Sequence, residues 1–145
     1  QREEDAAAVP VSIRGVNVLL AEDNEINMEI AEFMLANEGA AIRKAVNGQQ
    51  AVEMFSASEP GEIDVILMDV MMPVMSGLEA TRRIRSLNRP DARTVPIFAM
   101  TANAFADDAE RSRSAGMNEH LTKPIDAAVL TRTIARYVRG RETNP

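Results

Sequence analysis

The chain has 145 residues, a formal net charge of −6 and no cysteine, and 46% of its residues are hydrophobic. This length suits one domain with a real core, and the composition is that of a soluble globular protein. The acidic balance argues against direct contact with nucleic acid or an anionic membrane surface. Disulfides and thiolate metal sites are excluded, and no apolar run approaches the roughly 20 residues of a membrane span. A cytoplasmic location is expected, whether or not a parent protein is anchored in a membrane.

The two ends of the chain differ in character from its middle. Residues 1–15 are polar and then rich in alanine, without a clear period, and are interpreted as a linker. A domain is expected over residues 16–139, followed by a short tail at 140–145. Because the chain begins with Gln1 rather than Met, we expect it to be part of a longer protein.

The first predicted elements are a strand and a helix. An apolar run at residues 16–23 predicts the strand, which ends in two adjacent acids. A helix follows and ends at Gly39. Its expected core face consists of apolar residues at helical spacing, namely Ile26, Ile30, Phe33 and Met34.

Strands and helices then continue to alternate. Further strands are predicted at residues 40–46, 63–70, 95–102 and 119–124. The strand at 63–70 is apolar almost throughout, which is typical of a strand buried on both faces. Helices are predicted after Asn47, after Ser76, over about 105–115, and around Leu130, Ile134, Tyr137 and Val138. Strict alternation predicts an α/β fold with a parallel sheet covered on both faces.

Five polar residues fall where predicted strands end. Glu22 and Asp23 close the first strand, Asp69 the third, Thr101 the fourth and Lys123 the fifth. Each has an ordinary explanation when taken alone, such as a helix cap, a turn residue or a solvated side chain. Because ligands of open α/β sheets bind beyond the carboxyl ends of the strands, their joint placement indicates one site.

The chemistry of these residues points to a divalent cation and a phosphoryl group. Three carboxylates, Glu22, Asp23 and Asp69, cannot all stay ionised at close range without a cation. Oxygen ligands without His or Cys suit a hard ion, and Mg²⁺ usually takes further oxygens from phosphate. Lys123 adds positive charge, and Asp69 is then available as a nucleophile that forms an aspartyl phosphate.

The sequence resembles the response regulator receiver domain of two-component signalling. The resemblance rests on four motifs in order, "AEDN", "LMDVMMPVMSG", "MTANA" and "LTKP", and covers about residues 17–138. It implies a flavodoxin-like (βα)5 fold, a doubly wound sheet with strand order 2-1-3-4-5. It also implies that the chain is not itself an enzyme but accepts phosphate, loses it again, and belongs to a phosphorelay.

The resemblance implies a role for each site residue. Asp69 is the expected phosphoacceptor and a metal ligand. Asp23 is expected to bind Mg²⁺ directly and Glu22 through water, while the backbone carbonyl of Met71 completes the protein ligands. Lys123 is expected to pair with Asp69 or the phosphoryl group, ahead of a cis bond to Pro124.

Other positions are expected to switch or tune the domain. Thr101 is expected to bond a phosphoryl oxygen and move toward it. The accompanying aromatic position holds His120, the only histidine; the alternative is a surface histidine with no switching role. Met71 and Asn103, each two residues after a site residue, are candidates for tuning access of water. The methionines at 68, 71, 72 and 75 are expected to serve loop and core packing.

The expected output face comprises the helix at about 105–115, the fifth strand and the last helix. The expected partner is a histidine kinase or a histidine phosphotransfer domain. The sequence does not define the oligomeric state of the domain, and a monomer is one possibility. The non-Met start and the leading linker suggest the C-terminal receiver of a hybrid sensor histidine kinase, with a stand-alone receiver as the alternative.

Two other functional classes remain as alternatives. An Mg²⁺-dependent phosphohydrolase would also use an aspartate nucleophile, but it usually carries a second acid close behind. Here the residue two places after Asp69 is Met71. A docking module that is never phosphorylated would be expected to lack some of the site residues.

Overall fold

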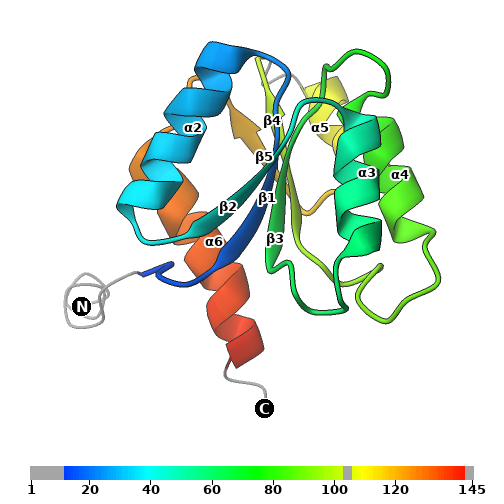
Figure 1. The fold of residues 1–145 in the computed structure, drawn as a ribbon. Coiled ribbons are helices and arrows are strands. Elements are labelled where there is room, and N and C mark those ends of the chain that lie inside the picture. Colours follow the sequence, from blue (N-terminus) through cyan, green and yellow to red (C-terminus); the bar gives the residue numbers. More distant parts are fainter. Residues whose placement is uncertain (1–11, 103–105, 143–145) are drawn as a thin grey trace.

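A five-stranded parallel sheet with the order β2-β1-β3-β4-β5 forms the centre of the molecule (Figure 1). The computed structural model describes residues 12–102 and 106–142. The strands are β1 (Asn17–Ala21), β2 (Ala41–Ala45), β3 (Val65–Asp69), β4 (Ile97–Thr101) and β5 (Glu119–Thr122). The helices are α2 (Glu25–Asn37), α3 (Gly48–Ala57), α4 (Gly77–Arg85), α5 (Ala106–Ala115) and α6 (Ala127–Glu142). The predicted fold class and strand order are confirmed.

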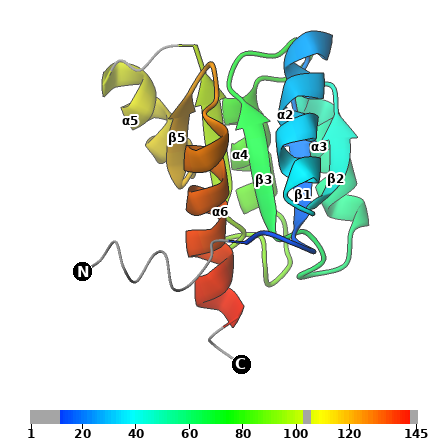
Figure 2. The ribbon, with the colours of Figure 1, turned by 90° about the vertical axis from the view of Figure 1, so that its left-hand side faces the viewer.

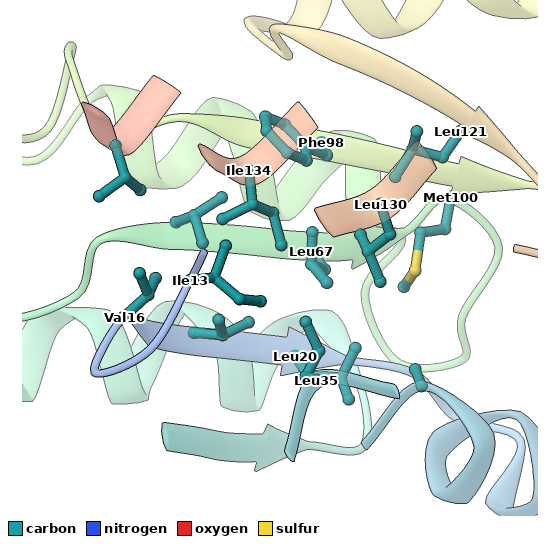
Figure 3. Packing of buried hydrophobic residues seen from close by; sticks show 14 of the residues in the cluster. Ile13, Val16, Leu20, Leu35, Leu67, Phe98, Met100, Leu121, Leu130 and Ile134 are labelled. Carbon is teal, nitrogen blue, oxygen red and sulfur yellow. The ribbon is translucent and has the colours of Figure 1, made fainter. Parts of the chain in front are cut away.

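Two hydrophobic layers cover the sheet. Successive side chains of a strand point to opposite faces, so Leu20 and Leu67 join the layer under α2 and α6, while Leu19 and Ile66 join the layer under α3 and α4. Figures 1 and 2 show α2 and α6 on one face and α3 and α4 on the other. The first layer includes Phe98, and Leu130 and Ile134 of α6 pack over the sheet (Figure 3).

The central strand β3 is buried along its whole length, as predicted. Its neighbours β1 and β4 are also almost wholly buried. Asp69, at the end of β3, is therefore a carboxylate that closes an apolar strand and lies at the carboxyl edge of the sheet.

Side-chain caps start three of the helices. Asn24 accepts a hydrogen bond from the backbone N–H of Asn27 at 2.9 Å and so begins α2. Asn47 begins α3 and Ser76 begins α4 in the same way, as predicted. The carboxylate of Glu79, three residues after Ser76, forms ion pairs with Arg82 and Arg83 on the surface of α4.

The predicted core face of α2 is wrong for three of its four residues. Ile26, Ile30 and Phe33 are 68%, 48% and 71% exposed, and only Met34 packs partly against the core. The buried residues are instead Met28, Ala31 and Leu35. This helix carries apolar residues on two sides, so periodicity alone does not select the buried one. The small side chain of Ala31 lets the helix approach the sheet closely.

Residues just before β1 pack against the sheet and the start of β2. Ile13 is fully buried in the layer under α2 and α6, and the N–H of Gly15 bonds the carbonyl oxygen of Gly39 at 2.9 Å. At the other end, α6 continues to Glu142. Within the described residues, no helix is long and apolar enough to span a membrane.

Candidate functional site

Four strand ends bring the predicted polar residues to one edge of the sheet. Glu22 and Asp23 follow β1, Asp69 ends β3, Thr101 ends β4, and Lys123 follows β5. Each of the three acids offers a carboxylate oxygen, and these oxygens all lie within 4.8 Å of one another. The structure therefore forms the carboxylate cluster that the sequence predicts.

Tight packing of the segment between β3 and α4 fixes the backbone of Asp69. At Gly77, an added Cβ would lie 2.1 Å from the carbonyl oxygen of Asp69, so only glycine allows this approach. The N–H of Gly77 also bonds the carbonyl oxygen of Val70 at 3.0 Å. The start of α4 is thereby held directly against the end of β3.

Lys123 joins the two buried acids. Its Nζ lies 2.9 Å from Oε1 of Glu22 and 3.2 Å from Oδ2 of Asp69. Both carboxylates are almost fully buried, and Lys123 is half-buried. Burial lowers the pKa of Lys123, but the two carboxylates outweigh burial and raise the pKa above its ordinary value. The lysine therefore remains charged at neutral pH.

One lysine does not balance the acids. Burial and the nearby Glu22 carboxylate raise the pKa of Asp69 to about 7, although Lys123 acts to lower it. The backbone N–H of Met71 donates to Oδ1 of Asp69 at 3.2 Å. The nucleophile candidate is thus a carboxylate whose charge is only partly compensated by its protein neighbours.

The donor set fits Mg²⁺. It consists of carboxylate oxygens alone, which suit a hard cation. Asp23 is exposed, so the cluster is open to solvent on one side. Asp23 is also not needed as the cap of α2, because Asn24 has that role. A divalent ion at this edge would supply the positive charge needed to balance the carboxylates of the cluster.

The remaining predicted residues differ in how deeply they are buried. Thr101 is buried, and its carbonyl oxygen accepts the N–H of Lys123 at 2.7 Å. His120 is partly buried on β5 and pairs in register with Ala99 of β4. The Lys123–Pro124 bond is cis, as the resemblance implies. Asn103, the second tuning candidate, lies outside the described residues.

The methionines near the site differ in exposure. Met68 is buried, and Met72 and Met75 are partly buried against the layer under α3 and α4. The side chain of Met71, however, is 75% exposed, so its predicted role in packing is wrong.

A cavity beside the cluster was not foreseen from the sequence. It has a volume of about 100 Å³ and lies between α2 and the segment that follows β5. Its lining is largely apolar and ends at two site residues; the residues are Glu22, Asn27, Ile30, Ala31, Met34, Met100, Lys123, Pro124 and Ile125. The sequence signal for this cavity was the apolar side of α2 that contains Ile30. Helical periodicity assigned that side to the core, so no cavity was expected beside it.

Comparison with known proteins identifies a family and several relatives. The family model of the response regulator receiver domain matches residues 18–135. Hybrid signal transduction histidine kinase I of Dictyostelium discoideum is 39% identical over 119 residues, which are 81% of this chain and 7% of that protein. The chain therefore spans only a small part of this relative's length.

Two solved structures are similar over most of their length. The receiver domain of the sensor histidine kinase PA1611 from Pseudomonas aeruginosa, described with a magnesium ion in its active-site cleft, is 40% identical. It matches with a TM-score of 0.78 over 86% of this chain and 98% of that one. The receiver domain of Saccharomyces cerevisiae Ssk1 was crystallised with the histidine phosphotransfer protein Ypd1. That match has 30% identity and a TM-score of 0.77 over 88% of this chain and 92% of that one.

Proposed function

The chain belongs to the response regulator receiver family, and we propose that it receives a phosphoryl group on Asp69 from the phosphohistidine of a partner protein. One observation carries this proposal. A buried carboxylate at the end of β3 lies among two further acids and a lysine whose Nζ is 3.2 Å from it. This arrangement supports a phosphoacceptor that works with a bound cation.

The proposed transfer exchanges one bond to phosphorus for another. A carboxylate oxygen of Asp69 forms a P–O bond while the P–N bond to the donor imidazole breaks. The imidazole nitrogen keeps the electron pair of that bond and takes up a proton from water. Lys123 stays protonated and is positioned to balance charge on the phosphoryl oxygens, since it already contacts Asp69 and Glu22. We assign Thr101, at the end of β4, to a hydrogen bond with a phosphoryl oxygen.

The metal ligands are proposed from the residues that fit. Asp23 and Asp69 would bind Mg²⁺ directly, Glu22 through water, and Met71 through its backbone carbonyl oxygen. The bound ion would neutralise the carboxylates and take oxygens of the phosphoryl group as further ligands. The magnesium ion described for the PA1611 receiver domain supports this assignment.

The wider role of the chain is also proposed. It is a domain that accepts phosphate and is not itself an enzyme, within a larger hybrid histidine kinase on the cytoplasmic side. The similarity to a hybrid kinase of Dictyostelium supports this placement. The Ssk1 complex with Ypd1 supports a histidine phosphotransfer protein as donor or acceptor. His120 is proposed as the switch residue, and Met71 and Asn103 as residues that tune hydrolysis.

Phosphorylation by a small donor tests the nucleophile. Incubation of the chain with phosphoramidate and Mg²⁺ should add one phosphate that is stable in acid and labile in base. Asp69→Asn should abolish the label, because an amide cannot act as this nucleophile. Asp64→Asn is a matched control, since Asp64 lies before β3 and its carboxylate accepts the N–H of Asn17. Labelling of Asp69→Asn at the rate of the unsubstituted chain would contradict the assignment.

Removal of the metal tests the cation. Phosphorylation should stop in EDTA and return with Mg²⁺. Asp23→Ala should weaken Mg²⁺ binding at least tenfold, and Glu22→Gln should weaken it less, because Asp23 is assigned as a direct ligand and Glu22 as one that acts through water. Titration calorimetry measures both affinities, and equal affinity for Asp23→Ala and the unsubstituted chain would exclude the direct role.

A further inference from the structure

A second hollow, here called the α5–β5 hollow, lies between the end of α5 and the start of β5. These two elements lie side by side at one edge of the sheet (Figure 2). The hollow has a volume of about 200 Å³ and a mostly polar lining. β5 begins in this hollow and ends next to Lys123, so the hollow and the carboxylate cluster lie at opposite ends of one strand. The lining residues are Ser112, Arg113, Met117, Asn118, Glu119 and His120.

Two side chains that α5 contributes to the hollow offer hydrogen-bond donors that are not used elsewhere. Ser112 is only 3% exposed, yet within the described residues its hydroxyl makes no hydrogen bond. Buried polar groups normally have a partner, so a hydroxyl that faces a hollow in this way indicates a ligand or water there. Arg113 is exposed and forms no ion pair with any part of the chain that the structure describes.

The side-chain amide of Asn118 is oriented by its neighbours. Its Oδ1 accepts a hydrogen bond from Nη2 of Arg85 at 2.9 Å and another from the backbone N–H of Ile97 at 2.8 Å. Both of these bonds require the oxygen of the amide, so the NH₂ group is the end that remains. Because Asn118 lines the hollow, this NH₂ group adds two further donors to it.

The one acid in the lining is engaged on another side. Oε2 of Glu119 accepts the hydroxyl of Tyr137 at 2.7 Å and lies 3.9 Å from Nη2 of Arg136. The positive charge of Arg113 has no such partner in the described chain. A guanidinium, a hydroxyl and an amide NH₂ at one hollow match a ligand that carries negative charge on several acceptor oxygens.

We propose that the α5–β5 hollow binds a small oxyanion, a phosphate ester or a carboxylate, and that the bound anion fastens the last turn of α5 to β5. Arg113 pairs with two oxygens of the anion, and Ser112 and Asn118 donate to it. The volume is below the roughly 300–1,000 Å³ of sites for drug-sized ligands, which suits a small metabolite. The binding is non-covalent and does not involve Asp69, so the proposal stands apart from phosphoryl transfer.

Titration with inorganic phosphate, followed by NMR of the nitrogen-15-labelled chain, tests the site. EDTA keeps the carboxylate cluster free of metal, and sodium chloride at equal ionic strength is the control for screening. The amide signals of residues 112–120 should shift and saturate, with a Kd on the order of 1 mM. Glycerol phosphate and succinate, titrated in the same way, then distinguish a phosphate ester from a carboxylate as the preferred ligand.

Variants locate the binding groups. Arg113→Ala should weaken phosphate binding roughly tenfold, as expected for loss of a charge-assisted hydrogen bond. Arg113→Lys should weaken it less, because it keeps the charge and loses only the planar fork. Arg93→Ala removes another exposed arginine, between α4 and β4, and should leave the affinity unchanged. An unchanged urea midpoint for Arg113→Ala shows that this variant is folded.

Amide hydrogen exchange tests the fastening of α5. Saturating phosphate should slow exchange over residues 112–118 in the unsubstituted chain, because the anion binds only when α5 and β5 are together. The same phosphate concentration should have no such effect on Arg113→Ala. Exchange in α3, which does not border the hollow, should not change in either protein.

Three results would overturn the proposal. Equal phosphate affinity in Arg113→Ala and the unsubstituted chain would exclude the hollow as the site. Shifts at Asp69 and Met71 without shifts at Asn118 would place the anion at the carboxylate cluster instead. Equal shifts with sodium chloride would show that phosphate acts only by screening. Binding that leaves exchange over residues 112–118 unchanged would refute the fastening of α5 to β5.

Discussion

At the scale of single residues, the ionisation of Asp69 links the chemistry of the site to the stability of the fold. Burial raises its pKa to about 7 in the folded protein, whereas an exposed aspartate has a pKa near 3.8. Between these values the folded state binds more protons than the unfolded state. Stability should therefore fall as the pH rises from about 4 to about 7. The carboxylate is kept in the site at a cost to folding.

Replacing this carboxylate should therefore stabilise the metal-free protein. In EDTA at pH 8, we expect Asp69→Asn to raise the free energy of unfolding by on the order of 1–3 kcal/mol. Near pH 4 the gain should be much smaller, because Asp69 of the unsubstituted chain is then protonated in the folded state and its burial carries no charge. Urea unfolding at the two pH values measures the difference. Glu53→Gln, an exposed acid on α3, is the control, and an equal gain at both pH values would contradict the explanation.

The site residues themselves were predictable because each is polar at the end of an apolar strand. Asp69 interrupts an apolar run, and parallel topology brings it to the same edge as Glu22, Asp23 and Lys123. The orientation of side chains was not predictable in this way. The pattern of strand ends does not show that Lys123 contacts Glu22 as well as Asp69, or that the side chain of Met71 is exposed.

At the scale of elements, the strands were predictable and the orientation of α2 was not. A strand such as β3 is buried on both faces, so it appears in the sequence as a continuous apolar run. Its prediction does not require deciding which side faces the core. In α2 both sides are apolar, and the sheet accepts the side that contains Ala31. The choice depends on shape, which a count of apolar residues does not record. The side left exposed contains Ile26, Ile30 and Phe33.

A polar contact that sequence reasoning missed holds α4, β4 and the end of α5 together. Arg85, on α4, donates to the carbonyl oxygens of Gly116, Ala92 and Val95, the shortest at 2.7 Å. It also donates to Oδ1 of Asn118 at 2.9 Å, and this same oxygen accepts the N–H of Ile97. Burial lowers the pKa of Arg85. Its charge is therefore solvated by carbonyl oxygens instead of water.

Loss of this contact should be costly. We expect Arg85→Met to lower the free energy of unfolding by about 2–4 kcal/mol, because several carbonyl oxygens would lose their donor. Arg82→Met is the control, since Arg82 makes only an exposed ion pair with Glu79 and should cost less than about 1 kcal/mol. Urea unfolding compares the two. Similar losses would show that the Arg85 contacts contribute little.

At the scale of the whole molecule, phosphorylation of Asp69 has to change the structure of a surface that a partner protein recognises. The proposed output face consists of α5, β5 and α6. β5 is an edge strand, fastened to α6 by the hydroxyl of Tyr137, which donates to Oε2 of Glu119 at 2.7 Å. The Tyr137 ring also packs edge-on against Phe98, with ring centres 5.2 Å apart. The side of β5 next to α6 is therefore held firmly.

The C-terminal end of the helix α5 is tied to α4. Its sequence has no large apolar residue between Ala106 and Ala115, and its C-terminal end is fixed through the bond from Arg85 to the carbonyl oxygen of Gly116. Phosphorylation adds about −1.5 to −2 charge at the opposite, carboxyl edge of the sheet, next to Thr101. A ligand shifts such an element only through contacts that differ between its two positions, and the bond from Thr101 to a phosphoryl oxygen would be that contact.

We therefore expect α5 to respond most when the site is filled. Beryllofluoride with Mg²⁺ should change amide hydrogen exchange over residues 106–117, while α3, which packs on the same face of the sheet without bordering Thr101, should change little. Asp69→Asn should abolish the response, because beryllofluoride needs the carboxylate. The helix is short of apolar anchors, so its change in exchange should exceed that of α6, which Leu130 and Ile134 hold against the sheet. Clear protection around Asp69 without any change in α5 would show that the phosphate does not reach this face, and the signal would then have to leave the domain at the site itself.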